Sequence, residues 1–382
     1  MSQLEQTDIS AINELRELVK DDLTPYYDTD FNLLRWFQGH NGNLIETAKK
    51  LRIHLKTRKS HWNLDKLHEQ PRSHPIHKFI PYGVTGESEV IENLIVYVEQ
   101  CGTSDYHGML QTYSIQEIMK ANLRDMEGML AECMRVEKMT GKQASILYVM
   151  DLSGITYDKK LYDLLTGPLK SLSEFMQEHY VELMKYFVLV NVPSFVYALW
   201  TIVKPILPEK TIQKVRILSS SHWRDEILEL AAPHALPTLW NTEKIDRFKA
   251  ILKEPQEFPI ENYHIPIIPP SVDKYRIYAG KFLMIEKELQ KGDILEWWVT
   301  GDANFSMGIF LSDNKDENNI ENMHTIYPVL GWMPGPTVVP LNDRIIAFEN
   351  GLYRIWLSNH RAWWRTLTIL GKFMVIPFGT IA

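Results

Sequence analysis

The chain has few cysteines and few of the features that would place it in a membrane. Only Cys101 and Cys133 occur in its 382 residues, which excludes a disulfide framework and favours a reducing compartment. Residues 186–203 carry no charged side chain, and a run of this length invites comparison with a transmembrane helix. Asn191 and Pro193 interrupt the run, however, and a bilayer would offer their freed backbone groups no partner. We therefore expect no membrane-spanning helix.

Signals for targeting, lipid anchoring and catalysis are also missing. The N-terminus is polar and acidic without a secretory signal, and neither end carries a lipidation motif. The glycine-rich nucleotide loops, Gly-x-Ser-x-Gly and His-Glu-x-x-His do not occur. His54, His61 and His68 recur at a regular spacing, but no carboxylate or cysteine accompanies them at ligand spacing. We therefore expect a cytoplasmic protein without catalytic residues, metal or cofactor, which contacts membranes only peripherally.

Length and charge narrow the class of protein further. A chain of 382 residues is too long for one ordinary core, so two or three domains are expected. The net charge of −7 argues against broad nucleic-acid binding, because nucleic-acid-binding proteins present basic surfaces. Nucleic acid is therefore not among the expected partners.

The patterns predict a small helical unit followed by an α/β domain. Residues 8–70 show apolar residues at helical spacing. Residues 75–245 alternate strands with helices, which indicates a mixed, mostly parallel sheet. Ser114 and Glu117 form a capping box for a long helix that ends at Gly141. Strands are expected over 91–98, 145–151, 186–190 and 214–218.

A helix expected over residues 44–59 is rich in basic residues. We place Lys56 and Arg58 on its outer face with four other basic residues. The face is either simply solvated or in contact with anionic lipid heads, which attract each basic residue by about 1 kcal/mol near the surface.

The pattern of predicted secondary structure changes in the C-terminal part of the chain. The sequence of residues 246–270 predicts a proline-rich linker. Residues 271–380 contain short, tryptophan-rich runs separated by turn residues, which predict an antiparallel β-sandwich. The runs cover 275–284, 293–300, 305–311, 344–348, 351–357 and 367–377. The expected fold class is therefore multidomain: helical unit, α/β domain and β-sandwich.

The uncharged run contains a buried strand over residues 186–190 and a helix over 194–203. The helix has a broad apolar face and a narrow polar stripe that includes Thr201 and Lys204. Two interpretations are open. The helix is either a core helix with one edge in water, or a movable wall over an apolar cavity whose stripe faces an anionic group.

The motifs around this helix resemble the CRAL-TRIO lipid-binding family. In order they are Tyr-Val-Glu at 180–182, Asn-Val-Pro at 191–193, Lys-Pro-Ile-Leu at 204–207, and the Lys-x-x-x-Leu strand at 214–218. Residues 151–154 and 236–241 resemble two further turns of the family. The stretch 292–359 resembles the GOLD domain of trafficking proteins. The order of domains is similar to that of the supernatant-protein-factor group of lipid-transfer proteins.

The resemblance implies a lipid held in an apolar cavity that the 194–203 helix gates. In family members that carry phosphatidylinositol, a Glu, a Thr and a Lys contact the headgroup, and the matching positions are Glu182, Thr201 and Lys204. The alternative role for two of them is a Glu182–Lys204 ion pair that holds the helix closed. The expected cavity and gate residues are Phe187, Phe195, Val196, Leu199, Trp200, Ile202 and Val203.

The function implied is a lipid carrier that transfers or presents its ligand between membranes. Its expected partners are a phospholipid or other hydrophobic ligand and a transient membrane surface. Phosphoinositide, phosphatidylcholine, tocopherol-like and isoprenoid ligands all stay open. The second hypothesis is a lipid-responsive trafficking adaptor, with a protein partner bound through residues 271–380.

Overall fold

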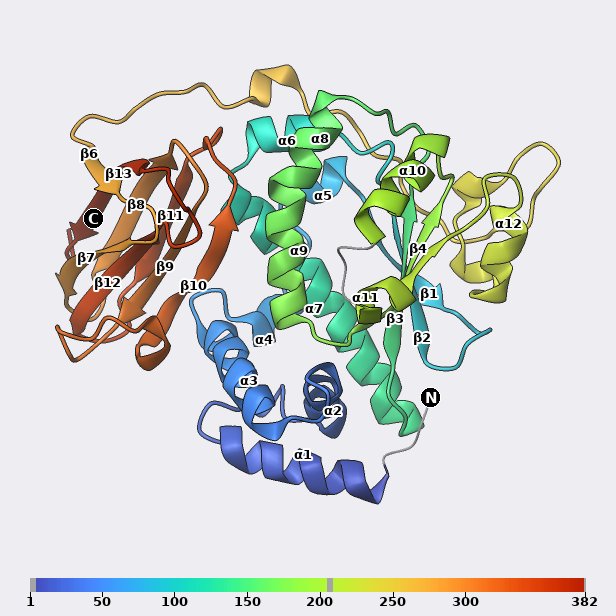
Figure 1. Ribbon diagram of the computed structural model, residues 1–382, viewed down its shortest axis with the longest axis horizontal. Coiled ribbons are helices and arrows are strands. Elements are labelled where there is room, and N and C mark those ends of the chain that lie inside the picture. The colour runs from blue at the N-terminus through green and yellow to red at the C-terminus, as the bar shows by residue number, and fades with distance from the viewer. Residues whose placement is uncertain (1–4, 205–208, 381–382) are drawn as a thin grey trace.

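The structure, a computed structural model, describes residues 5–204 and 209–380 (Figure 1). Residues 205–207 of the Lys-Pro-Ile-Leu segment lie outside the described residues, as do the side chains of Ile202 and Val203. Within the described ranges, no helix is both long and apolar enough to cross a bilayer.

Polar side chains cap the N-termini of the second and third helices. The Thr29 side chain accepts a hydrogen bond from the backbone N–H of Asn32, and the Asn43 side chain accepts one from that of Glu46. The helices are α1 Gln6–Val19, α2 Asp30–Gly39, α3 Leu44–Lys59, α4 Leu64–Leu67 and α5 Ile76–Phe79. The basic helix expected over 44–59 coincides with α3.

Arg58 of α3 is buried, so the prediction that it lies on the outer face of the helix was wrong. Its guanidinium pairs with Glu127 at 2.8 Å and with Asp65 at 2.6 Å, and both Arg58 and Glu127 have fully buried side chains. Helical periodicity assigns a charged residue to solvent by default. An acidic partner from a distant helix reverses that assignment, because a paired charge can be buried.

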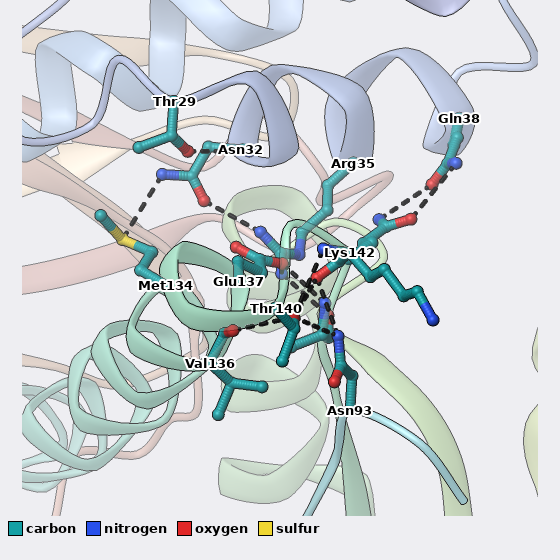
Figure 2. Close-up of polar contacts among 12 residues, drawn as sticks. Thr29, Asn32, Arg35, Gln38, Asn93, Met134, Val136, Glu137, Thr140 and Lys142 are labelled. Carbon is teal, nitrogen blue, oxygen red and sulfur yellow. Dashed lines mark hydrogen bonds and ion pairs between the residues drawn. The ribbon is translucent and has the colours of Figure 1, made fainter. Parts of the chain in front are cut away.

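A second buried ion pair fastens the N-terminal helices to the α/β part of the chain. Arg35 of α2 pairs with Glu137, near the end of α7 (Ile115–Thr140). The same guanidinium donates to the Ala144 carbonyl oxygen at 2.8 Å, and the Ala144 N–H donates to Glu137 at 2.8 Å. Figure 2 shows these groups converging where α7 ends and the next strand begins. These hydrogen bonds compensate much of the two buried charges, although Arg35 Nε and Glu137 Oε2 are buried without a hydrogen-bond partner.

Strands β1–β5 form a sheet in sequential order. Strand β1 is antiparallel to β2, and β2 through β5 run parallel. The strands are β1 Gly83–Glu87, β2 Leu94–Glu99, β3 Ser145–Asp151, β4 Met184–Val190 and β5 Val215–Ile217. The predicted mixed, mostly parallel sheet is thus confirmed, although β1 was not expected.

Sequential strand order places the crossover helices on one face of this sheet, because parallel crossovers are right-handed. The crossovers are α6 Tyr106–Thr112 and α7, then α8 Lys159–Thr166 and α9 Pro168–His179, then α10 Ser194–Val203 and α11 Glu209–Lys214. Side chains alternate along β2: Ile95 and Tyr97 join the core under the helices, while Val96 and Val98 face the other side. That other side is covered by the segment containing α12 Trp223–Glu226, with Trp223 and Trp240 in its core. Short 3-10 helices follow at Ile227–Glu229, Pro233–Ala235, Thr238–Trp240 and Ile260–Asn262.

The long helix α7 agrees with its predicted boundaries. Ser114 and Glu117 exchange the two hydrogen bonds of a capping box, and Gly141 ends the helix in the left-handed conformation with φ of 68°.

The C-terminal strands form two packed antiparallel sheets, ordered β10-β9-β12-β7 and β11-β8-β13-β6. The strands are β6 Asp273–Ile277, β7 Phe282–Leu289, β8 Ile294–Gly301, β9 Phe305–Leu311, β10 His324–Met333, β11 Leu341–Ile346, β12 Gly351–Ser358 and β13 Leu367–Ile376, with a 3-10 turn at Ile320–Asn322. The predicted β-sandwich is confirmed. The run expected over 275–284 is two strands, because the chain turns through Gly280 at φ of 72°.

The sandwich packs against the helices rather than standing apart (Figure 1). The His61 N–H donates to the Ile326 carbonyl of β10 at 2.7 Å, and the Ser171 hydroxyl of α9 donates to the Trp332 carbonyl at 2.9 Å. One hydrophobic cluster includes residues of both parts, such as Leu55 and Trp297. The boundaries 8–70, 75–245, 246–270 and 271–380 remain proposals for how the chain divides.

Candidate functional site

A cavity of about 1150 Å³ lies on the helix-covered face of the parallel sheet. Glu99 at the end of β2 and Leu152 just after β3 line it, so it lies at the carboxyl ends of the strands. This is the end at which open α/β sheets hold their ligands. Residues of α6 through α10 form its walls, and residues 334–339, between β10 and β11, close one side. The β-sandwich thus contributes to the cavity.

The walls of this cavity are mainly apolar. Ile118 and Met119 of α7 and Leu172 of α9 are among the lining residues. Of the residues predicted from sequence, Phe195, Val196 and Leu199 of α10 lie in the wall. The contributions of α6, α8 and residues 334–339 were not predicted from the sequence.

Two predicted cavity residues lie elsewhere. Phe187 of β4 is half-buried and packs against Tyr148, with ring centroids 5.7 Å apart. Trp200 of α10 is half-buried and is not among the cavity-lining residues. Their proposed contact with lipid therefore depends on a movement of α10 or on a ligand that extends beyond this cavity.

A polar cluster in the cavity was missed by the sequence analysis. The Glu99 carboxylate accepts a hydrogen bond from the Tyr106 hydroxyl at 2.6 Å and another from the Tyr148 hydroxyl. Burial raises the pKa of both phenols and of the Cys101 thiol well above their ordinary values, and the charge of Glu99 raises them further. The three groups therefore stay protonated near neutral pH. In the described part of the chain, no cationic side chain pairs with Glu99.

The predicted headgroup residue Glu182 is already paired. Its carboxylate accepts a hydrogen bond from the Lys214 ammonium at 2.8 Å, and both side chains are about a quarter exposed, at 26% and 24%. Glu182 has a positive φ of 53° in the turn before β4. The partner observed for Glu182 is thus the lysine of the Lys-x-x-x-Leu strand motif, not Lys204.

Thr201 and Lys204 are exposed at the far end of α10 from the cavity. The Thr201 hydroxyl donates to the Tyr197 carbonyl at 3.0 Å. The Tyr197 hydroxyl donates to the Leu218 carbonyl at 2.8 Å and so ties α10 to the end of β5. Helical rise separates Lys204 from Phe195 by roughly 13 Å along the axis. Thr201 and Lys204 therefore lie toward the C-terminal end of α10, beyond the residues that line the cavity.

Three family motifs that are distant in sequence meet at Asp151. Its carboxylate accepts hydrogen bonds from Asn191 Nδ2 at 2.8 Å, from Trp240 Nε1 at 2.7 Å and from the Ser153 N–H at 2.9 Å. Asp151 is buried, and these donors satisfy its charge. The contact fixes the turns after β3 and β4, from which the α8 and α10 segments emerge. This shared role explains why the residue types occur together.

The described residues contain no group of three or more metal-ligating side chains. His54 and His61, considered from their sequence spacing, point into different environments. His54 is buried against His179, with the two Nδ1 atoms 3.1 Å apart. His61 stacks on Tyr327, with ring centroids 6.1 Å apart.

Comparison with protein families covers most of the chain. Residues 92–241 match the family model of the CRAL/TRIO domain. Residues 4–67 match a domain of unknown function, and residues 269–376 match an F28H7.8-like C-terminal domain. The last description does not name GOLD, so the GOLD resemblance stays a prediction, whereas the sandwich it implied is present.

Individual proteins are similar to this chain over much of its length. The CRAL-TRIO domain-containing protein F28H7.8 of Caenorhabditis elegans is 26% identical over 375 residues, which cover 94% of this chain and 88% of the relative. The phosphatidylinositol/phosphatidylcholine transfer protein SFH4 of Arabidopsis thaliana is 20% identical over 362 residues, which cover 89% of this chain and 58% of the relative. The crystal structure of Sfh5 is similar with a TM-score of 0.49 and 14% identity, over 68% of this chain and 96% of that one.

The family match spans β2 to β5, the helix α10 and most of the cavity wall. The motif residues that carried the resemblance also have structural partners in this chain, as Asp151, Asn191 and Trp240 show. Residues 92–241 therefore form a CRAL-TRIO domain.

Proposed function

We propose that this protein binds a lipid in the cavity beneath α10 and carries or presents it between membranes. The observation that supports the proposal most strongly is the cavity itself: about 1150 Å³, mainly apolar, inside a CRAL-TRIO domain. Ligand pockets for drug-sized molecules are about 300–1,000 Å³. This cavity has room for a larger, flexible ligand.

The energetics of extraction explain why such a cavity is needed. Each methylene group moved from a bilayer into water costs about 0.8 kcal/mol, so a lipid with ~30 methylenes costs on the order of 20 kcal/mol. A protein lowers this cost only by offering apolar walls while it contacts the membrane. The apolar side chains of α7, α9 and α10 provide such walls.

The gate of the cavity is proposed to be α10. Its Phe195, Val196 and Leu199 cover the cavity, while Pro193 precedes the helix and allows the chain to change direction there. The hydrogen bond from Tyr197 to the Leu218 carbonyl holds the helix in the observed position. Breaking this one bond and turning α10 outward would expose the apolar face to a bilayer.

Lys204, Thr201 and Glu182 are proposed to contact the lipid headgroup. Lys204 is exposed and makes no ion pair with any described residue, so its ammonium is available to a phosphate. Glu182 is held by its ion pair with Lys214 in the turn before β4. The name of the plant relative, a phosphatidylinositol/phosphatidylcholine transfer protein, supports a phospholipid as the ligand class.

The experiment is native mass spectrometry with lipid extraction on protein purified from a eukaryotic host, wild type beside Lys204→Ala. Bound phospholipid in the wild type that decreases in the variant would support both the carrier function and the headgroup role of Lys204. A bound neutral lipid that the substitution leaves unchanged would support the carrier and contradict the headgroup role. Absence of lipid from both proteins would contradict the carrier function and favour the trafficking adaptor, whose protein partner would bind through residues 271–380.

A further inference from the structure

The turn between β12 and β13 exposes two adjacent tryptophans. Trp363 is 94% exposed and Trp364 is 86% exposed. The other nine tryptophans, all in the described ranges, are buried or half-buried. Two adjacent large aromatic side chains exposed together form a contiguous apolar patch, which marks a candidate contact surface. Tryptophan is also the residue that is enriched at the boundary between lipid headgroups and water.

Basic side chains flank the pair. Arg361 and Arg365 are exposed on either side of it, and residues 359–366 contain no acidic residue. The turn therefore presents two indoles between two guanidinium groups. The Arg361 guanidinium is paired with Glu174, and Arg365 Nη2 donates one hydrogen bond to the Asp302 carbonyl at 2.7 Å. Arginine pairs well with phosphate oxygens, so the charge pattern suits the phosphates of a lipid headgroup layer.

The turn is held in place and is not a loose loop. Asn359 is buried, and its Nδ2 donates to the carbonyl oxygens of Ile277 at 3.0 Å and Arg365 at 2.8 Å. The Ala362 N–H donates to the Asn359 carbonyl at 3.1 Å. Because the backbone is already ordered, contact with a surface would cost little conformational entropy.

The turn lies beside the wall of the cavity. Arg361 forms an ion pair with Glu174 of α9. The first turn of α9 lines the cavity through Pro168 and Leu169, and Leu169 is itself 40% exposed. A flat surface that rests on the tryptophans would thus lie close to the helices that enclose the ligand.

We propose that Trp363 and Trp364 insert into the headgroup layer of a phospholipid bilayer while Arg365 contacts lipid phosphates. This surface would be the membrane-contact surface of the proposed carrier. Its biological purpose rests on the proposed carrier function. Contact itself does not require a lipid in the cavity. A protein partner would instead need a complementary acidic and apolar pocket.

The test is co-sedimentation of the full chain with vesicles of phosphatidylcholine, alone or with 30 mol% phosphatidylserine. The double variant Trp363→Ala/Trp364→Ala should bind about tenfold more weakly or worse to both. Arg365→Glu should weaken binding roughly fivefold, mainly to the anionic vesicles. Brominated phosphatidylcholine should quench more tryptophan fluorescence in the wild type than in the double variant.

The matched control is Ile346→Ala/Phe348→Ala. These residues are 63% and 48% exposed and lie just before β12, at the opposite end of that strand from the tryptophans. This control should bind vesicles like the wild type. Equal binding by the tryptophan variant, or equal loss in the control, would overturn the proposal.

Lipid extraction from the same samples separates this proposal from the carrier function. A tryptophan variant that retains its bound lipid but loses vesicle binding supports the docking surface. A wild type that binds vesicles through the tryptophans but contains no lipid contradicts the carrier function alone. A wild type that contains lipid but does not bind vesicles overturns the docking surface alone. Unchanged thermal unfolding of the variants, expected for exposed residues, shows that they are folded.

Discussion

The ammonium group of Lys214, at the end of α11, pairs with the Glu182 carboxylate at 2.8 Å, in the turn before β4. Both residues belong to the motifs that resemble the CRAL-TRIO family. Their contact leaves Lys204 exposed, without an ion pair to any described residue. The two lysines therefore have different expected roles, one structural and one toward the ligand.

The first prediction compares these lysines. Lys204→Ala should reduce the amount of bound anionic phospholipid and leave the unfolding midpoint unchanged. Lys214→Ala should lower the free energy of unfolding by about 0.5–1 kcal/mol, because the pair it breaks is only partly exposed. Native mass spectrometry and urea unfolding measure the two effects. The assignment is wrong if Lys214→Ala removes the lipid while Lys204→Ala retains it.

The second prediction concerns the volume of the cavity. Val196→Trp adds bulk to the side of α10 that lines the cavity, so the mass of co-purified lipid should fall. Ala198→Trp is the control, because Ala198 is exposed on the same helix and does not line the cavity. Equal lipid content in the two variants would show that the ligand does not occupy this cavity.

The third prediction concerns the buried pair of Arg58 and Glu127. The Glu127 carboxylate also accepts a hydrogen bond from the Tyr180 hydroxyl at 2.7 Å. Glu127→Gln leaves the buried Arg58 charge with Asp65 as its remaining acidic partner, so the free energy of unfolding should fall by about 3 kcal/mol. Chemical denaturation measures the change. Glu69→Gln, which removes the exposed partner of Lys66, should leave the midpoint unchanged.

The fourth prediction is a loss of stability in acid. Burial lowers the pKa of His179 to about 3, and burial together with the Arg58 charge lowers that of His54 well below its ordinary value. The unfolded chain therefore binds more protons than the folded one between about pH 3 and pH 6.5. The contribution of these histidines is fully present above pH 6.5 and is lost as the pH falls toward 3, by up to about 1.4 kcal/mol per pH unit for each group.

Substitution separates this effect from general acid denaturation. Unfolding midpoints measured from pH 7.5 to pH 4 should fall less steeply for His179→Phe than for the wild type. The exposed His222 provides the control, and His222→Phe should follow the wild-type curve. Parallel slopes for His179→Phe and the wild type would contradict the assignment to this pair.

Local pattern predicted the elements that depend on neighbouring residues. The capping box at Ser114 and the glycine at 141 defined α7 because both signals act within one helical turn. Alternation and length identified β3 and β9 with their observed bounds. Strand β10 was missed, because Pro328 and Gly331 interrupt its pattern and neither is favourable inside a strand.

Such patterns could not predict contacts between residues that are far apart in the sequence. Periodicity placed Arg58 on the outside of α3, whereas a buried glutamate on α7 holds it inside. The motifs left a Glu182–Lys204 ion pair open as one alternative, whereas the structure pairs Glu182 with Lys214 at the end of α11. In each case, the choice between two partners depends on how separate elements pack.

The sequence by itself determined the order of domains, the parallel sheet, the apolar helix at 194–203 and the CRAL-TRIO motifs. Each of these depends on the order of residues within short stretches of the chain. Only the tertiary structure decided that Phe195, Val196 and Leu199 line a cavity with Glu99 and the sandwich residues 334–339. It also decided that Trp363 and Trp364 remain exposed beside α9. The physical reason is that cavities and surfaces arise where several elements meet, and no single stretch of chain encodes the space between them.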